Sequence, residues 1–317
     1  MNRDSVDWRG YFAAVPTPFN EDGSLAPDLL RELLEHYVEQ GLHGVLVNGT
    51  TGEWFSQSPQ ERRTTAETAI DAVAGRIPVI IGCTDYTANE VIAFASHAME
   101  AGAAGFASTP PPYCKPFPDE TVAFYEDIAN GLPDAPMMVY NWPHGTSVEI
   151  GTDLALRLIE IDTVVAFKDS TPNVDQFFAS ARAVHERVRT FGPYMSRRGL
   201  DELRAHGGDG TIGGGSLFGR PDPEFWEAVW RGDDEAALAH AIRTEELFPK
   251  LWLPGGWAGV HGHYASELKA LMAILGQPGG TVRRPRLPVT DPAAIEEIRA
   301  ILDEAGLQVP TGNPSVT

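Results

Sequence analysis

The sequence contains few of the features that would suggest a disulfide-stabilised or membrane-spanning protein. It has only two cysteines, Cys83 and Cys114, in 317 residues, and no apolar run is long enough to cross a bilayer. The N-terminal segment MNRDSVDWRGYF lacks the apolar core of a signal peptide. We therefore expect a cytoplasmic protein that does not contact a membrane.

Basic residues are also scarce, since 24 Lys and Arg stand against 44 Asp and Glu, for a formal net charge of −20. Nucleic acids are bound by clusters of Lys and Arg, so this balance argues against a nucleic-acid partner. Hydrophobic residues make up 43% and charged residues 21% of the chain, as in soluble globular proteins. An anionic substrate would require a locally favourable pocket.

Short apolar, β-branched runs alternate with longer amphipathic segments over roughly the first 230 residues. We predict eight strands, in segments 11–19, 44–49, 78–83, 105–110, 136–142, 164–170, 189–194 and 209–215. Strands that are apolar throughout indicate a parallel sheet covered by helices, and eight βα units predict an α/β fold of the (β/α)8 TIM-barrel type. A doubly wound open sheet is less favoured, because the first βα turn lacks a GxGxxG motif.

The strand pattern stops near residue 232, and helical patterns follow. We therefore predict a (β/α)8 catalytic barrel over residues 1–232 and a C-terminal helical region over 233–317. Within that region, 276–288 is a connection rich in Pro, Gly and Arg, and 309–317 is expected to be an irregular tail.

Functional residues of a barrel lie where its strands end. The segment VVAFKDST places Lys168 at the end of the sixth predicted strand. Lysine is rarely buried, and a low-dielectric site favours the neutral amine, which can attack a carbonyl. Lys168 is therefore a candidate nucleophile, and the alternative is an ion pair with Asp169 at a solvated strand end.

The second predicted strand is followed by NGTTGE. Gly49 and Gly52 permit a tight turn, and Thr50 and Thr51 add two hydroxyls and consecutive backbone N–H groups ahead of a helix N-terminus. Such a turn can hold a carboxylate. The alternative is an ordinary turn in which one of the threonines caps the next helix.

Tyr140, in YNWP, ends the fifth predicted strand. A tyrosine there is more often a packed residue than a proton carrier. An amine, a carboxylate cradle and a phenol nevertheless combine into one mechanism, which is Schiff-base chemistry on a 2-oxo acid such as pyruvate.

Four motifs resemble, in order, those of the dihydrodipicolinate synthase and N-acetylneuraminate lyase family: GTTGE at 49–53, PYCKP at 112–116, YNWP at 140–143 and FKDST at 167–171. The resemblance covers essentially the whole chain. It implies a class I, Schiff-base aldolase or lyase without metal or organic cofactor. It also implies a homo-oligomer, usually a tetramer built as a dimer of dimers.

Residue by residue, the resemblance implies that Lys168 forms the imine and that Tyr140 relays protons to and from the substrate. The turn from Gly49 to Thr51 matches the segment that binds the pyruvoyl carboxylate through two threonines, and Thr50 also joins the hydroxyl relay.

Two further residues match family positions outside these strand ends. Tyr113 matches the tyrosine that reaches into the neighbouring subunit's relay, although the extra proline in TPPPYCKP leaves a one-position ambiguity. Ile212, in GTIGGG, matches the eighth-strand residue whose backbone carbonyl faces the site.

The sequence departs from members that make dihydrodipicolinate, which carry an arginine in a YNVPxRT pattern. Here YNWPHGTS places Gly145 at the arginine position, so a role in lysine biosynthesis is doubtful. Arg197 or Arg198 either replaces that arginine or begins a solvated helix. Trp54 and Trp142 either line the distal pocket or pack beneath the loops.

We therefore expect a lyase that cleaves or forms a hydroxylated 2-oxo acid, of the 2-oxo-3-deoxy sugar acid or 4-hydroxy-2-oxo acid type, with pyruvate as one partner. A dehydratase of a 2-oxo-3-deoxy sugar acid would use the same imine. Less favoured are dihydrodipicolinate synthase proper, a non-catalytic binder of small acids and a pyridoxal phosphate enzyme using Lys168. The HGHY segment, 261–264, lacks an acidic or cysteine partner at ligand spacing and predicts no metal site.

Overall fold

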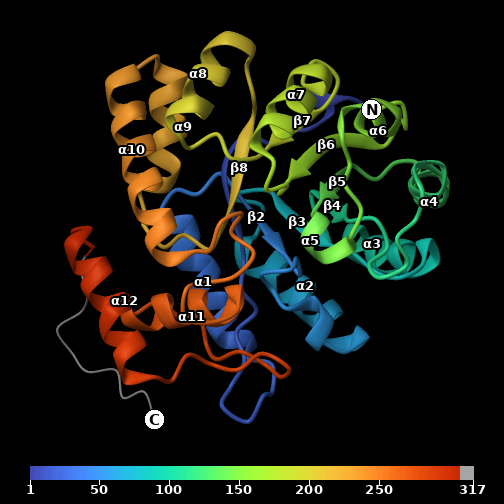
Figure 1. Cartoon of the computed structure of the whole chain (residues 1–317). Helices are drawn as coiled ribbons and strands as arrows, with labels where there is room; N and C mark the ends of the chain where they lie inside the picture. Colours follow the sequence, from blue (N-terminus) through green and yellow to red (C-terminus); the bar gives the residue numbers. More distant parts are fainter. Residues whose placement is uncertain (308–317) are drawn as a thin grey trace.

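The computed structural model describes residues 1–307, and it shows eight parallel strands that close into a barrel in the order β1 to β8 (Figure 1). The strands are Gly10–Ala14 (β1), Gly44–Val47 (β2), Val79–Gly82 (β3), Gly105–Ser108 (β4), Met137–Asn141 (β5), Val164–Asp169 (β6), Arg189–Phe191 (β7) and Gly210–Gly214 (β8). All eight predicted strands and the closed barrel are confirmed. The predicted irregular tail, 309–317, lies outside the described residues.

Helices surround this barrel and connect its strands (Figure 1). They are Pro27–Glu39 (α1), Pro59–Val73 (α2), Ala88–Glu100 (α3), Pro118–Gly131 (α4), Thr152–Leu158 (α6), Val174–Val184 (α7), Arg197–His206 (α8) and Pro221–Arg231 (α9). There are also three short helical turns: Arg3–Ser5 (η1) before β1, Trp54–Ser56 (η2) after β2 and Pro143–Thr146 (α5) after β5. No helix within residues 1–307 is long and apolar enough to span a membrane.

Local sequence signals mark the helix ends, as α2 shows. Ser58 is its N-cap and Pro59 its first residue. The Ser58 hydroxyl accepts a hydrogen bond from the backbone N–H of Glu61 at 3.2 Å, and the Glu61 carboxylate accepts one from the backbone N–H of Ser58 at 2.8 Å. This reciprocal capping box satisfies two N–H groups that the helix itself leaves unpaired.

The pleat of the strands separates the barrel interior from the layer that faces the helices. Met138 and Ala166 belong to the interior cluster, whereas Phe167 packs in the outer one. Successive side chains of a strand point to opposite faces, so residues two positions apart share a face. Tyr140 and Lys168 follow Met138 and Ala166 by two residues and therefore face the barrel axis at its carboxyl end.

Three more helices follow the barrel and are orange to red in Figure 1: Asp234–Leu251 (α10), Tyr264–Ile274 (α11) and Pro292–Glu304 (α12). Helix α10 packs against α8 and α9, and α12 contacts α10 and α11. The predicted C-terminal helices are thus present. The division into two units at residue 232 stays a prediction.

A buried ion pair joins the barrel to these C-terminal helices. Glu53, in the turn after β2, and Lys269, on α11, lie 2.7 Å apart, and their side chains are 0% and 4% exposed. The ammonium of Lys269 also donates to the carbonyls of Thr17 and Thr281, at 2.7 Å each. All three of its N–H donors are therefore used, which offsets the cost of removing the charge from water.

We expect Lys269→Met to lower the free energy of unfolding by about 3–5 kcal/mol, because the Glu53 charge would remain buried without its partner. Urea denaturation followed by circular dichroism would measure this change. The matched control is Lys250→Met, since Lys250 pairs with Glu304 at 2.9 Å on the surface, with 40% and 70% of the side chains exposed. That variant should lose about 1 kcal/mol or less. Equal losses would contradict the importance of the buried pair.

Candidate active site

Strand β6 places Lys168 inside the mouth of the barrel, where only 7% of the residue is exposed. Its Nζ atom lies 3.8 Å from the centre of the Tyr140 ring, and the two residues are direct partners in the pairing of β5 with β6. Tyr140 is also 7% exposed and stacks on Trp142, with ring centres 6.5 Å apart. The amine and the phenol therefore share one buried environment.

Asp169 does not pair with Lys168, although the two are adjacent in sequence. One carboxylate oxygen of Asp169 accepts hydrogen bonds from the side-chain amide of Asn141 and the backbone N–H of Thr171, both at 2.8 Å. Adjacent strand residues face opposite sides, so this carboxylate points away from the barrel axis. Burial raises the pKa of Asp169 to about 7. The ion-pair alternative for Lys168 is therefore wrong.

The turn after β2 is held rigidly at both ends. Asn48 and Glu53 adopt left-handed conformations, with φ of 58° and 52°, which residues other than glycine rarely adopt. The side-chain amide of Asn48 donates to a backbone carbonyl of α2 at 2.8 Å, and Glu53 is held by its buried ion pair. Thr50 and Thr51 stand between these two anchors, so the backbone that carries them is held in place.

The structure corrects two expectations about this turn. Neither Thr50 nor Thr51 caps the next helix, because Ser58 is the N-cap of α2. The turn also does not lead directly into the N-terminus of a long helix, since η2 lies between them. The turn therefore does not lie at the N-terminus of α2 and does not face the dipole of that helix.

A cavity of about 80 Å³, here called the inner cavity, lies at the carboxyl end of the barrel. Gly49 belongs to the turn but does not line it. The predicted site residues that do line this cavity are Lys168, Tyr140, Thr50, Thr51 and Ile212. Five residues from strands β5, β6 and β8 and from the turn after β2 thus converge on one space.

Tyr113 lies apart from the inner cavity of its own chain. It is 90% exposed and has a φ of 75°, in the loop between β4 and α4. An aromatic residue held in this strained conformation with its ring in solvent is unusual.

Sequence reasoning missed the C-terminal contribution to the inner cavity. The HGHY segment has no metal-ligand pattern, yet its His263 and Tyr264 line the cavity, together with Trp257. Within residues 1–307 there is no group of three or more His, Cys, Asp or Glu placed to hold a metal ion. His263 and Tyr264 reach the barrel mouth at the start of α11, and Trp257 reaches it from the segment before this helix, which sequence spacing cannot show.

The glycine run at the end of β8 is the sequence signal that could have pointed to Tyr264. A Cβ atom on Gly214 would lie 2.1 Å from the Tyr264 hydroxyl oxygen, so only glycine permits this approach. Burial of the Tyr264 hydroxyl and its proximity to Tyr140 raise the pKa of Tyr264 above its ordinary value. Tyr264 is therefore a neutral phenol beside Tyr140.

A larger cavity of about 330 Å³, here called the outer cavity, continues from the inner one. The two share Thr50, Trp142, Trp257 and His263. Trp54 and Trp142 both line the outer cavity, so of the two alternatives for these indoles the structure favours the pocket.

The Trp142 ring occupies the space beside Gly145, the position that carries an arginine in the YNVPxRT pattern. A Cβ atom on Gly145 would lie 1.9 Å from two carbons of this ring. Any larger residue at 145 would require Trp142 to move. The Trp142 ring thus fills the space that a side chain at position 145 would need.

Arg197 and Arg198 do not replace that arginine. They begin α8, are 56% and 48% exposed, and pair with Glu245 and Asp175 respectively. Neither lines the inner or the outer cavity. The solvated helix start is therefore the correct interpretation.

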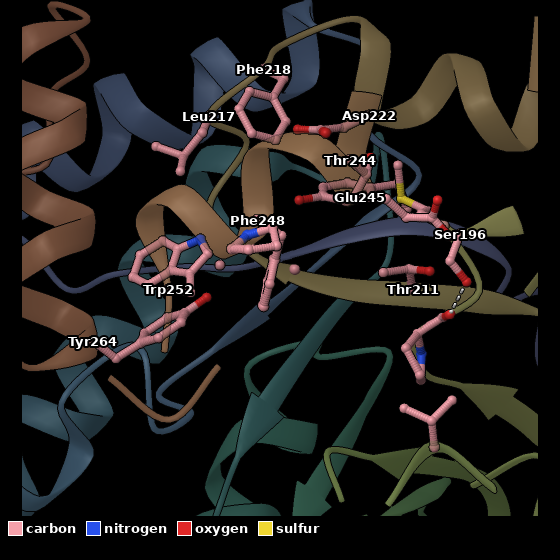
Figure 2. Close-up of a pocket in the computed structure, with 17 residues that line it drawn as sticks. Ser196, Thr211, Leu217, Phe218, Asp222, Thr244, Glu245, Phe248, Trp252 and Tyr264 are labelled. Atoms are coloured by element: carbon pink, nitrogen blue, oxygen red, sulfur yellow. Dashed lines mark hydrogen bonds between the residues drawn. The ribbon is translucent and has the colours of Figure 1, made fainter. Parts of the chain in front are cut away.

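A third cavity, of about 420 Å³, shares Gly214 and Tyr264 with the inner cavity and is drawn in Figure 2. Figure 2 shows the rings of Trp252 and Tyr264 side by side, and their centres are 4.4 Å apart. Asp222 also lines this cavity, and it is only 3% exposed. The Ser216 hydroxyl donates to Asp222 at 3.3 Å, and burial raises the pKa of this carboxyl to about 7.

The fold and the site define a (β/α)8-barrel protein with a buried lysine on its sixth strand, facing a cavity lined by hydroxyl groups. Residues 7–305 match the model of the dihydrodipicolinate synthetase family, and the chain belongs to this family. The family resemblance inferred from the four motifs is confirmed.

Known relatives extend over nearly the whole chain. This chain is 32% identical over 307 residues to an uncharacterized DapA-like lyase of Rhizobium meliloti, and the alignment covers 93% of this chain and 95% of that protein. It is 31% identical over 306 residues to a 4-hydroxy-tetrahydrodipicolinate synthase of Thermosynechococcus vestitus, covering 95% and 99%. The dihydrodipicolinate synthase of Acinetobacter baumannii complexed with pyruvate superimposes with a TM-score of 0.84 at 26% identity, covering 95% and 99%.

The buried Asp222 should make stability depend on pH. Its folded pKa, about 7, exceeds the ordinary value of 3.8, so between these values the folded chain keeps a proton that the unfolded chain has lost. Its contribution to stability is therefore complete below pH 3.8 and is lost as the pH rises toward 7.

We expect Asp222→Asn to remove this effect, so that wild type loses stability relative to the variant as the pH rises, by at most about 1.4 kcal/mol per pH unit. Urea denaturation of both proteins at a series of pH values would measure the difference. If the difference in unfolding free energy between wild type and Asp222→Asn were the same at every pH, the raised pKa of Asp222 would be contradicted.

Proposed function

We propose that the protein is a class I, Schiff-base lyase that cleaves or forms a hydroxylated 2-oxo acid, with pyruvate as one partner. The observation that carries this proposal is the buried Lys168 amine above the Tyr140 ring, in a cavity that Thr50 and Thr51 also line. Family membership and the pyruvate complex of the Acinetobacter relative support it.

In this mechanism the Lys168 amine attacks the C2 carbonyl of the 2-oxo acid. The carbinolamine that forms takes a proton from the Tyr140 hydroxyl, loses water and becomes a protonated imine, which leaves Tyr140 as a phenolate. The substrate carboxylate lies in the turn from Gly49 to Thr51, where hydroxyl and backbone N–H groups can donate hydrogen bonds to it. The rigid turn thus orients C2 toward the amine before the bond forms.

Cleavage of a 4-hydroxy-2-oxo acid then needs a base for the C4 hydroxyl. The Tyr140 phenolate left by the dehydration step accepts this proton, C3–C4 breaks, an aldehyde leaves, and the bonding electrons move into the imine to give an enamine. Protonation at C3 and hydrolysis then release pyruvate and free Lys168. The protonated imine is the electron sink, so this route needs neither a metal nor an organic cofactor.

The substrate is a hydroxylated 2-oxo acid of the 2-oxo-3-deoxy sugar acid or 4-hydroxy-2-oxo acid type. The contact between Trp142 and Gly145 supports this choice over dihydrodipicolinate synthesis, because the outer cavity lacks an arginine at position 145. Dehydration of a 2-oxo-3-deoxy sugar acid begins with the same imine and differs only in the bond that breaks.

We expect borohydride reduction in the presence of pyruvate to add the mass of one reduced pyruvoyl group to the wild-type chain and none to Lys168→Ala. Mass spectrometry of the intact protein would measure this gain. The control is Lys250→Ala, which removes an exposed lysine from α10 and should be labelled like the wild type. No mass gain in the wild type, or a gain that persists in Lys168→Ala, would refute the proposal.

We also propose a homo-oligomer, a tetramer built as a dimer of dimers, in which Tyr113 completes the proton relay of a neighbouring subunit. Its exposed ring and its positive φ support this role, because the residue lines neither cavity around Lys168 in its own chain. Phe117, at the end of the same loop, and Tyr86, between β3 and α3, are also exposed, at 75% and 59%.

Complementation between two inactive variants tests this role. Lys168→Ala and Tyr113→Phe should each be at least about tenfold less active alone. Co-expressed in equal amounts, they should recover about a quarter of wild-type activity, because half of the dimers are mixed and each mixed dimer contains one complete site. Activity no greater than the sum of the separate variants would show that Tyr113 does not act across an interface.

A further inference from the structure

The outer cavity has an unusual charge for so acidic a protein. The chain has a formal net charge of −20, yet none of the described residues that line this cavity is Asp or Glu. Its ionisable lining residues include His144, His263 and Arg286. An anion that enters this cavity would therefore meet no carboxylate on its wall.

Arg286 reaches the outer cavity because the segment before it is tightly anchored. Arg283 donates to the Glu61 carboxylate at 2.7 and 2.9 Å, to the Ser56 carbonyl at 3.0 Å and to the Gly23 carbonyl at 2.7 Å. The backbone N–H of Arg286 donates to the Arg283 carbonyl at 3.1 Å and closes a turn. The position of Arg286 is thus set by fixed contacts, not by a free loop.

The guanidinium of Arg286 itself is not engaged by a carboxylate among the described residues. Its carbon atom lies 5.1 Å from the centre of the Phe55 ring, and its Nε is buried without a hydrogen-bond partner in residues 1–307. Because Arg286 lines the outer cavity, its guanidinium can donate hydrogen bonds to an anionic ligand there.

His263 lies between the two cavities and is neutral. Burial and the charge of the neighbouring Arg286 lower its pKa to about 4. Its Nδ1 is also buried without a hydrogen-bond partner among the described residues. A neutral imidazole can donate or accept a hydrogen bond. His263 therefore suits a hydroxyl group in the middle of the substrate chain, between the carbonyl carbon that Lys168 attacks and the opposite end of the substrate.

We propose that Arg286 binds a second anionic group, at the end of the substrate remote from the imine, and so determines specificity. This inference rests on the proposed function, because the first anionic group is the carboxylate held by Thr50 and Thr51. The inner cavity, about 80 Å³, takes the pyruvoyl part, and the outer cavity, about 330 Å³, takes the hydroxylated chain. Carboxylate and phosphate both match a guanidinium, so the far group is one of these.

The test uses protein whose Lys168 has been reduced onto pyruvate, so that the inner cavity is already filled. Three short probes are titrated and followed by tryptophan fluorescence, since Trp54, Trp142 and Trp257 line the outer cavity. The probes are 3-hydroxypropanoate, 2-hydroxyethyl phosphate and the neutral propane-1,3-diol. Wild type, Arg286→Met, Arg286→Lys and Arg284→Met are compared. Arg284 is the matched control, because it lies two residues away and is exposed.

We expect at least one anionic probe to bind wild type about tenfold or more tightly than the diol. Arg286→Met should abolish this preference, Arg286→Lys should keep part of it, and Arg284→Met should leave it unchanged. The tighter of the two anions identifies the far group as carboxylate or phosphate.

Each failure has a distinct meaning. If wild type does not trap pyruvate, the proposed function fails, and this inference fails with it. If trapping is normal but the three probes bind equally, or if Arg286→Met binds anions like wild type, only the role of Arg286 is refuted.

Discussion

The ion pair between Glu53 and Lys269 is the contact on which the geometry of the site depends. Glu53 ends the turn that presents Thr50 and Thr51, and Lys269 lies on α11, whose first residues cover the barrel mouth. The pair therefore fixes the turn that carries Thr50 and Thr51 relative to the C-terminal wall of the pocket. A buried pair is weak evidence for stability, but it imposes one arrangement, because either charge alone would be costly in that interior.

The same region of the chain supplies the distal half of the pocket. Arg283 lies in the segment between α11 and α12 and binds the carboxylate of Glu61 at the start of α2. The turn that follows Arg283 places Arg286 at the outer cavity. At the opposite wall, Trp142 occupies the space beside Gly145. The two ends of the pocket are thus built by different parts of the chain: barrel strands and the turn after β2 around Lys168, and the C-terminal connection together with Trp142 at the far end.

Much of the fold and the inner site could be predicted from the sequence. Apolar runs and capping residues are local signals, so eight strands and the start of α2 at Ser58 are recognisable without coordinates. Lys168 and Tyr140 are recognisable because barrel sites lie at strand ends. The pairing of Lys168 with Asp169 was a wrong alternative, because strand alternation sends neighbouring side chains to opposite faces.

Periodicity and short motifs were enough to specify the barrel, the family and five residues that line the inner cavity, because their signals lie close together in sequence. The folded structure was needed to show that His263, Tyr264 and Arg286 reach the same mouth, and that Arg197 points elsewhere. Those positions depend on how α11 and the connection before α12 pack on the barrel. Such packing joins residues more than a hundred positions apart, as Lys269 and Glu53 show, and no local pattern encodes it.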